Sequence, residues 1–165
     1  MKSKRFKIMA ILFLIGFSIA LGVSYSVNDG GRKEGIFKVE YDSSWKLVYG
    51  NEFMLKHKKT NSVINIQSKK LEDKFIDTDL KYLIDDIIYS IEEQNKDYKL
   101  IKISDDVNTE YQAFSYLYEK NKEQVLVNVY KNNGTLVIAY YEADSEVYDI
   151  VLDSVDTILS SLRIS

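Results

Sequence analysis

The side chains in this sequence that could do chemistry are mainly carboxylates, which gather in three groups. They lie at Asp85-Asp86, at Asp105-Asp106 with Glu110, and from Asp144 to Asp156. Two carboxylates that meet in space can serve as the acid and base of a glycosidase, and several together can bind Ca²⁺. The run 105–110 lacks the alternating ligands and turn glycine of a Ca²⁺ loop, so we interpret it as a solvated loop. A glycosidase-like pair stays open.

Other catalytic and metal-binding side chains are scarce. The chain has no Cys and one His, His57, which is flanked by Lys56, Lys58 and Lys59. Thiolate chemistry is therefore excluded, and a cation at His57 would be repelled by its neighbours. There is also no Gly-x-Ser-x-Gly, no phosphate-binding glycine loop and no His-Glu-x-x-His. We expect no catalytic residue, no cofactor and no metal site, and hence a non-enzymatic protein.

Aromatic side chains offer a second kind of site. Tyrosines recur at Tyr116, Tyr118, Tyr130, Tyr140 and Tyr141, and Trp45 follows a predicted turn. Such residues can line a groove for a glycan or a peptide, but they also fill the rim of a core while their polar atom stays in water. Core filling is the interpretation that we favour. The candidates for a ligand or partner face are Trp45, Tyr116, Tyr118 and Tyr140.

The first residues have the pattern of an export signal. A basic flank, Lys2 to Lys7, precedes an apolar run, Ile8 to Val23, as in a signal peptide or an N-terminal signal anchor. Cleavage near Ser26 would follow small residues, and both the cleaved and the anchored form stay open. Positive charge ahead of the run places the domain outside the cytoplasm. We predict a signal or anchor in residues 1–26, a linker in 27–34 and one domain in 35–165.

Hydrophobic periodicity places the domain's residues on strands and helices. Alternating or continuous apolar runs predict strands at 36–41 (continued at 45–48), 53–55, 63–66, 100–103, 111–118, 125–130 and 135–143. Helical spacing predicts a helix of about five turns, from caps at Asp77-Thr78-Asp79 to Ile91. A last helix is predicted from caps at Asp144 and Ser145 to Leu162.

This order, βββ-α-ββββ-α, predicts an α+β fold. Short connections between successive strands favour a mostly antiparallel central sheet of about six or seven strands, with the helices packed on it as an αβα sandwich. An N-terminal hydrophobic signal or anchor helix precedes this domain. The strand at 135–143 is apolar on both faces, so it must be covered on both faces and, with the helix that follows it, forms the core of the domain.

Several spaced motifs resemble the PsbP/Mog1-like domain over about residues 35–162. They are Phe37-x-Val39-x-Tyr41-x-x-x-Trp45, Ala113-Phe114-x-Tyr116, Ile138-x-Tyr140-x-x-Ala143-x(4)-Tyr148 and Ile158-x-x-Ser161-Leu162. The family usually has Pro before the Trp, where this chain has Asp42-Ser43-Ser44. The resemblance implies an αβα sandwich and a non-enzymatic role, since characterised members are an extrinsic photosystem subunit and a small-GTPase-binding protein, alongside bacterial envelope proteins. It transfers no functional residue.

The net charge of the domain disfavours some classes of binding partner. The chain has 22 basic and 25 acidic residues, and removing the four N-terminal cations leaves 18 against 25, a net charge of −7 for the domain. An acidic domain is a poor ligand for nucleic acid or anionic lipid, so membrane contact is expected only through residues 8–23. We hypothesise a binding or assembly module that presents a sheet edge or a helix face to an envelope protein. The alternative is a binder of a small ligand, glycan or metal ion, or a hydrolase with paired carboxylates, on the Tyr-rich face.

Overall fold

The structure is a computed structural model that describes residues 36–48, 53–106 and 111–165. The predicted signal or anchor (1–26) and linker (27–34), with the domain boundary at residue 35, lie outside the described residues. Among the residues that are described, no helix is both long enough and apolar enough to cross a membrane.

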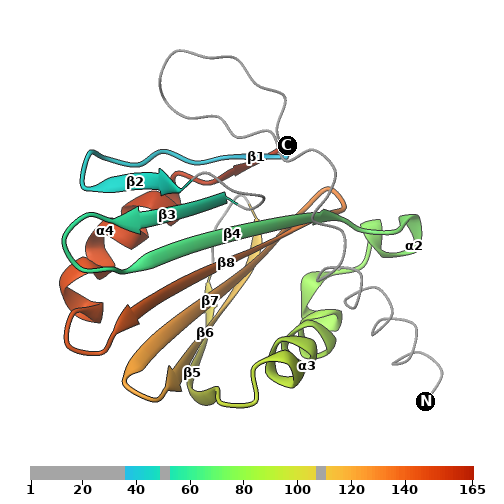
Figure 1. Cartoon of the computed structure of the whole chain (residues 1–165). Helices are drawn as coiled ribbons and strands as arrows, with labels where there is room; N and C mark the ends of the chain where they lie inside the picture. Colours follow the sequence, from blue (N-terminus) through green and yellow to red (C-terminus); the bar gives the residue numbers. More distant parts are fainter. Residues whose placement is uncertain (1–35, 49–52, 107–110) are drawn as a thin grey trace.

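Seven strands form one antiparallel sheet in the order β2-β3-β4-β8-β7-β6-β5 (Figure 1). The strands are Trp45–Val48 (β2), Phe53–His57 (β3), Val63–Lys70 (β4), Lys99–Asp106 (β5), Gln112–Lys120 (β6), Glu123–Asn132 (β7) and Thr135–Asp144 (β8). Every neighbouring pair is antiparallel. The predicted α+β class and the antiparallel sheet of six or seven strands are confirmed.

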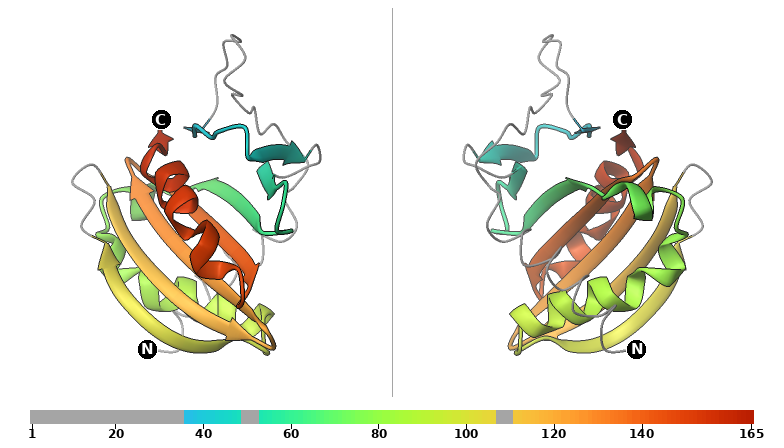
Figure 2. Two further views of the ribbon diagram at one scale, coloured as in Figure 1. Left: turned by 90° about the vertical axis from the view of Figure 1, so that its left-hand side faces the viewer. Right: turned by 90° about the vertical axis from the view of Figure 1, so that its right-hand side faces the viewer.

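Two helices, α3 (Ile84–Gln94) and α4 (Tyr148–Ser160), lie on opposite faces of this sheet (Figure 2). Strand β8 supplies both hydrophobic clusters, with Val137 and Ala139 facing α4 and Leu136 and Ile138 facing α3. Successive side chains of a strand point to opposite faces, so an apolar strand needs cover on both sides. The predicted cover on both faces of this strand is confirmed, and the strand is the middle one of the sheet order.

The first predicted strand, 36–41, is too long, and it does not belong to the central sheet. Only Phe37–Lys38 (β1) is strand, and it pairs with Arg163–Ile164 (β9) in a separate two-stranded sheet. Strand β9 was not predicted. The backbone N–H of Glu40 donates to Ser161 Oγ at 2.7 Å and extends this contact. Alternation over a few residues does not specify whether a strand pairs with its neighbour or with the far end of the chain.

The first predicted helix, from caps at 77–79 to Ile91, is α-helical only from Ile84 (α3), because its first turn, Leu80–Tyr82 (η1), is 3₁₀. A separate short helix, Asp73–Ile76 (α2), precedes it and was not predicted. Asp79 caps η1 by accepting a hydrogen bond from the N–H of Lys81 at 3.0 Å. The buried Lys131 of β7 donates to the carbonyl of Ile76 at 2.7 Å and holds the end of α2 against the sheet. This hydrogen bond joins segments that are far apart in the chain, so the local helical periodicity could not predict it.

Helix α4 begins later than predicted, because residues 144–147 form a turn in which Val147 N–H donates to the carbonyl of Asp144 at 3.0 Å. Its buried face includes Val151, Val155 and Ile158. Ile150 is an apolar residue within the predicted helix, but it is 74% exposed. It lies about 100° around the helix from Val151, on the solvent side.

The packing of α4 can be tested with two isoleucines of the same helix. Replacing Ile158, which is 1% exposed, with Ala should lower the free energy of unfolding by about 2–5 kcal/mol, because a cavity is left under the helix. The matched change Ile150→Ala should alter it by less than about 0.5 kcal/mol. Urea unfolding of the purified full chain, followed by the fluorescence of its single Trp, measures both. Equal effects would contradict this orientation of α4.

Candidate binding groove

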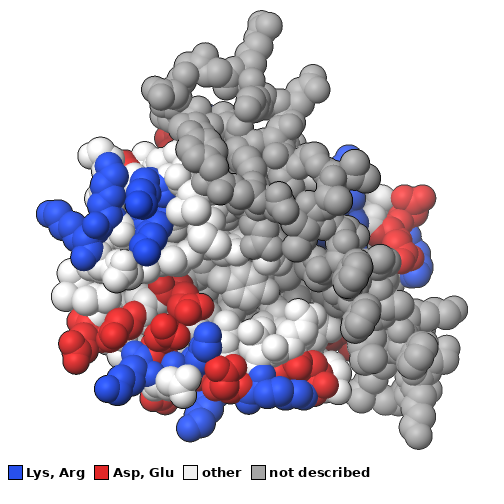
Figure 3. All heavy atoms as spheres, in the orientation of Figure 1, with Lys and Arg blue, Asp and Glu red and all other residues white. Residues whose placement is uncertain are grey.

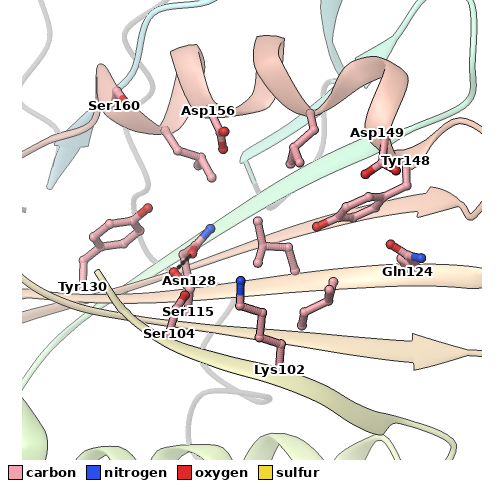
Figure 4. Close-up of a pocket in the computed structure, with 14 residues that line it drawn as sticks. Lys102, Ser104, Ser115, Gln124, Asn128, Tyr130, Tyr148, Asp149, Asp156 and Ser160 are labelled. Carbon is pink, nitrogen blue, oxygen red and sulfur yellow. Dashed lines mark hydrogen bonds between the residues drawn. The ribbon is translucent and has the colours of Figure 1, made fainter. Parts of the chain in front are cut away.

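Helix α4 covers only part of its face of the sheet. It packs mainly on β2, β3, β4 and β8, whereas β5, β6 and β7 curve away from it (Figure 2). A groove of about 860 Å³ lies between the helix and these three strands (Figure 4). It is lined by Lys102 and Ser104 of β5, Ser115 and Leu117 of β6, Gln124, Leu126, Asn128 and Tyr130 of β7, and Tyr148, Asp149, Leu152, Asp156, Leu159 and Ser160 of α4.

Two hydrogen bonds fix the position of α4 and hence the helix wall of the groove. The hydroxyl of Tyr141, a fully buried residue of β8, donates to the carbonyl of Tyr148 at 2.9 Å. The indole Nε1 of Trp45 donates to Ser154 Oγ at 2.8 Å. Buried polar groups need such partners, so each bond ties one helical residue to a specific strand. The helix is therefore held at both its first and its middle turns.

The floor of the groove contains a polar row across three strands. The register places Ser104 beside Ser115, and Ser115 beside Asn128. Asn128 is only 4% exposed, and its Oδ1 accepts a hydrogen bond from Ser115 Oγ at 2.5 Å. No described residue is a hydrogen-bond partner of its amide nitrogen. The floor therefore presents donors to whatever occupies the groove.

Charges of opposite sign face each other across the groove. Lys102 extends from β5, while Asp149 and Asp156 project from α4 (Figure 4). Lys102 makes no ion pair with a described residue. The two aspartates are seven residues apart, which on a helix is about 10 Å along the same side. Asp149 also lies in the first turn of α4, where a negative charge is favourable.

This arrangement suits hydrogen bonding and ion pairing. The lining contains neither His nor Cys. In residues 36–48, 53–106 and 111–165 no three His, Cys, Asp or Glu side chains are grouped so that they could hold a metal ion. The carboxylates of a glycosidase flank the substrate from two sides at about 5–9.5 Å, whereas Asp149 and Asp156 project from the same side of one helix.

The candidate residues from the sequence lie elsewhere. Trp45 is 2% exposed and packs edge-on against His57, with ring centres 5.1 Å apart. Tyr116 and Tyr118 are buried beneath α3, where the Tyr118 hydroxyl donates to Glu92 Oε1 at 3.1 Å. Burial, followed by the charge of Glu92, raises the pKa of Tyr118. The half-buried Tyr140 packs against the same cluster. None of the four lines the groove.

Sequence reasoning placed Tyr130 in a possible groove-lining series but missed Lys102, Asn128, Asp149 and Asp156 as partners in one site. One signal was present in the sequence. Asn128 is the single polar residue in the apolar run 125–130, and Asn is disfavoured in strands. The aspartates carry no such signal, since acidic residues are common on the solvent side of a helix.

A second group of acids lies at the end of β7 and β8. Lys120 Nζ is 3.8 Å from carboxylate oxygens of both Glu123 and Glu142. Burial raises the pKa of Glu142, Lys120 lowers it, and Glu123 and Asp97 raise it further. A hollow of about 460 Å³ is lined by Glu123 and Glu142. Figure 3 shows acidic side chains gathered near this end of the sheet and lysines over β2 and β3.

The raised pKa of Glu142 predicts a pH-dependent stability. The folded state holds this proton more tightly than the unfolded chain, whose ordinary pKa is 4.5. The stabilisation is therefore complete below pH 4.5 and is lost as the pH rises through the folded-state pKa. Glu142→Gln removes this loss, so its Tm relative to the wild type should rise between pH 4 and pH 7.

The control is Glu119→Gln, which removes an exposed carboxylate from β6, a strand separated from β8 by β7. Tm values of both variants across that pH range supply the measurement. A relative Tm for Glu142→Gln that rises no more than that for Glu119→Gln would contradict the prediction.

Comparison with known proteins identifies the fold. No protein-family model matches this chain, and no curated protein matches it in sequence. The solution structure of the cyanobacterial PsbP (CyanoP) of Synechocystis sp. PCC 6803 matches with a TM-score of 0.55 and 14% identity, over 88% of this chain and 99% of that one.

LpqN of Mycobacterium tuberculosis, described as involved in cell envelope biogenesis, matches with a TM-score of 0.59 and 11% identity, over 83% of this chain and 87% of its own. At these identities the likeness concerns the fold alone. The fold implied by the sequence motifs is confirmed: the chain has the PsbP/Mog1-like fold.

Proposed function

We propose that this chain is a non-enzymatic binding module of the cell envelope, and that its groove holds a segment of another envelope protein. The observation that carries the proposal is the groove itself. In it Asn128, which is more than nine-tenths buried, and Lys102, which makes no ion pair with a described residue, face two aspartates of α4. Polar groups are placed in such positions at a cost in stability, which is offset when a ligand engages them. The description of LpqN, a protein of the same fold, supports an envelope role.

A protein segment fits the groove better than a glycan does. Glycan sites use exposed aromatic faces, but the rings of Tyr130 and Tyr148 are 3% and 5% exposed. The edge strand β5, which borders the groove, also exposes three apolar residues, Leu100, Ile101 and Ile103, at 46–53%. Leu100 and Ile103 pair with Tyr118 and Tyr116, so they lie on the α3 face of the sheet, opposite the groove. Exposed apolar residues are typical of protein interfaces, and a partner that also contacted them would reach from the groove around this edge strand.

The proposal includes the location that the N-terminus predicts. Residues 1–26 would act as a signal peptide or signal anchor, and the membrane would be contacted through residues 8–23 only. The net charge of −7 for the remainder disfavours nucleic acid as a partner. The alternative, a small-ligand or metal-ion binder or a hydrolase, would rest on Glu123 and Glu142, whose hollow is not lined by the candidate tyrosines.

Site-specific crosslinking in cells tests the proposed interface. A photoreactive amino acid at the exposed Ser104, on the groove floor, should capture one discrete envelope protein. The same group at Tyr82, 71% exposed and outside the groove, should not. Adding Leu126→Trp, which fills the groove, should remove the captured band while the melting temperature stays within a few degrees of the parent's. The same bands from both positions, or none from Ser104, would contradict the proposal.

Cell fractionation tests the location. The tagged chain should be recovered outside the cytoplasm, either in the membrane at full size or released and about 3 kDa smaller after cleavage near Ser26. Replacing Lys2, Lys4, Arg5 and Lys7 with Glu should retain it in the cytoplasm, because the positive flank sets the orientation. Full-length wild-type chain in the cytoplasmic fraction would exclude an envelope role.

A further inference from the structure

The groove has two walls of opposite charge, and this pattern specifies the kind of segment that it can hold. Asp149 and Asp156 project from α4, with Leu152 between them, while Lys102 projects from the strand side (Figure 4). The inference rests on the proposed function, because it concerns the occupant of the same groove.

Structural roles explain some of these charged residues one at a time, but no such role explains why they face each other across the groove. Asp149 stabilises the first turn of α4, and a lysine on an edge strand such as β5 discourages sheet extension. Asp156 lies beyond the first turn of the helix, so the helix N-terminus does not account for its charge. Asn128 is 4% exposed on β7, where an apolar side chain would pack better. A ligand in the groove would explain together the opposed charges on its two sides and the buried amide of Asn128 on its floor.

An extended chain matches this geometry through its alternation. Its successive side chains point to opposite sides. A segment in which acidic and basic residues alternate therefore carries all its carboxylates on one side and all its cations on the other. Lying between α4 and the sheet, it would direct the cations to Asp149 and Asp156 and the carboxylates to Lys102. Donors of the floor, including the Asn128 amide, would meet its carbonyl groups.

We propose that the groove selects an extended polypeptide segment of alternating acidic and basic residues. Two blocked octapeptides of identical composition provide the probe, one alternating Glu and Lys and the other with four Glu followed by four Lys. The alternating peptide should bind the full chain at least tenfold more tightly at low ionic strength, as measured by fluorescence anisotropy. Added salt should weaken it, since the contacts are charged.

Charge reversals in the protein provide matched controls. Lys102→Glu alone, or Asp149→Lys together with Asp156→Lys, should raise the Kd of the alternating peptide at least tenfold. Lys122→Glu and Asp153→Lys, on the exposed β6–β7 turn and the outer side of α4, should change its Kd by less than about twofold. The triple variant with all three groove charges reversed should regain binding, because the peptide can rotate and exchange its two faces. This recovery excludes misfolding as the cause of the losses.

Equal affinity for the two peptides, or no loss in the charge-reversed variants, would overturn the charge-pattern inference. Crosslinking from Ser104 separates this failure from that of the proposed function. If Ser104 captures a partner but peptide binding does not depend on charge, the groove is an interface whose specificity does not come from these charges. If both experiments fail, the groove is not an interface.

Discussion

The structure depends on covering one strand from both sides. Strand β8 alternates between side chains that pack under α4 and side chains that pack under α3, and most of them are buried. In water such a strand is stable only between two apolar layers. The central position of β8, the opposite placement of the helices and the division of the core into two clusters all follow from this requirement.

Each helix is too narrow to cover a seven-stranded sheet, and the two helices are offset. Helix α3 packs on β6, β7 and β8, whereas α4 packs on β2, β3, β4 and β8. The alternation in β7 follows this division. Val125, Val127 and Val129 face α3 and are fully buried, while Gln124 and Asn128 face the side that α4 leaves open. The groove is thus a direct consequence of covering β8 with two short helices.

The open half-face is where this chain can differ from others of its fold without disturbing the core. The same fold occurs in CyanoP and in LpqN at 14% and 11% identity, which leaves ample room for different surfaces on one scaffold. In this chain the half-face carries a polar row and opposed charges, held in place by the bonds of Tyr141 and Trp45 to α4. Trp45 and Tyr141 are therefore core residues that also hold α4 in place, and α4 carries two of the charged residues of the groove.

The sequence by itself determined the two-sided burial of 135–143, most strand positions and the αβ order, because these follow from local periodicity. It did not determine the pairing of β1 with β9, or the break before α3 that Lys131 secures. Nor did it show that Lys102, Asn128, Asp149 and Asp156 share one groove. Those features join residues distant in the chain, so only the offset of the helices and the strand register decide them. Residue type alone does not indicate whether a Trp or a Tyr is exposed, and it is the tertiary packing that buries Trp45 and Tyr118.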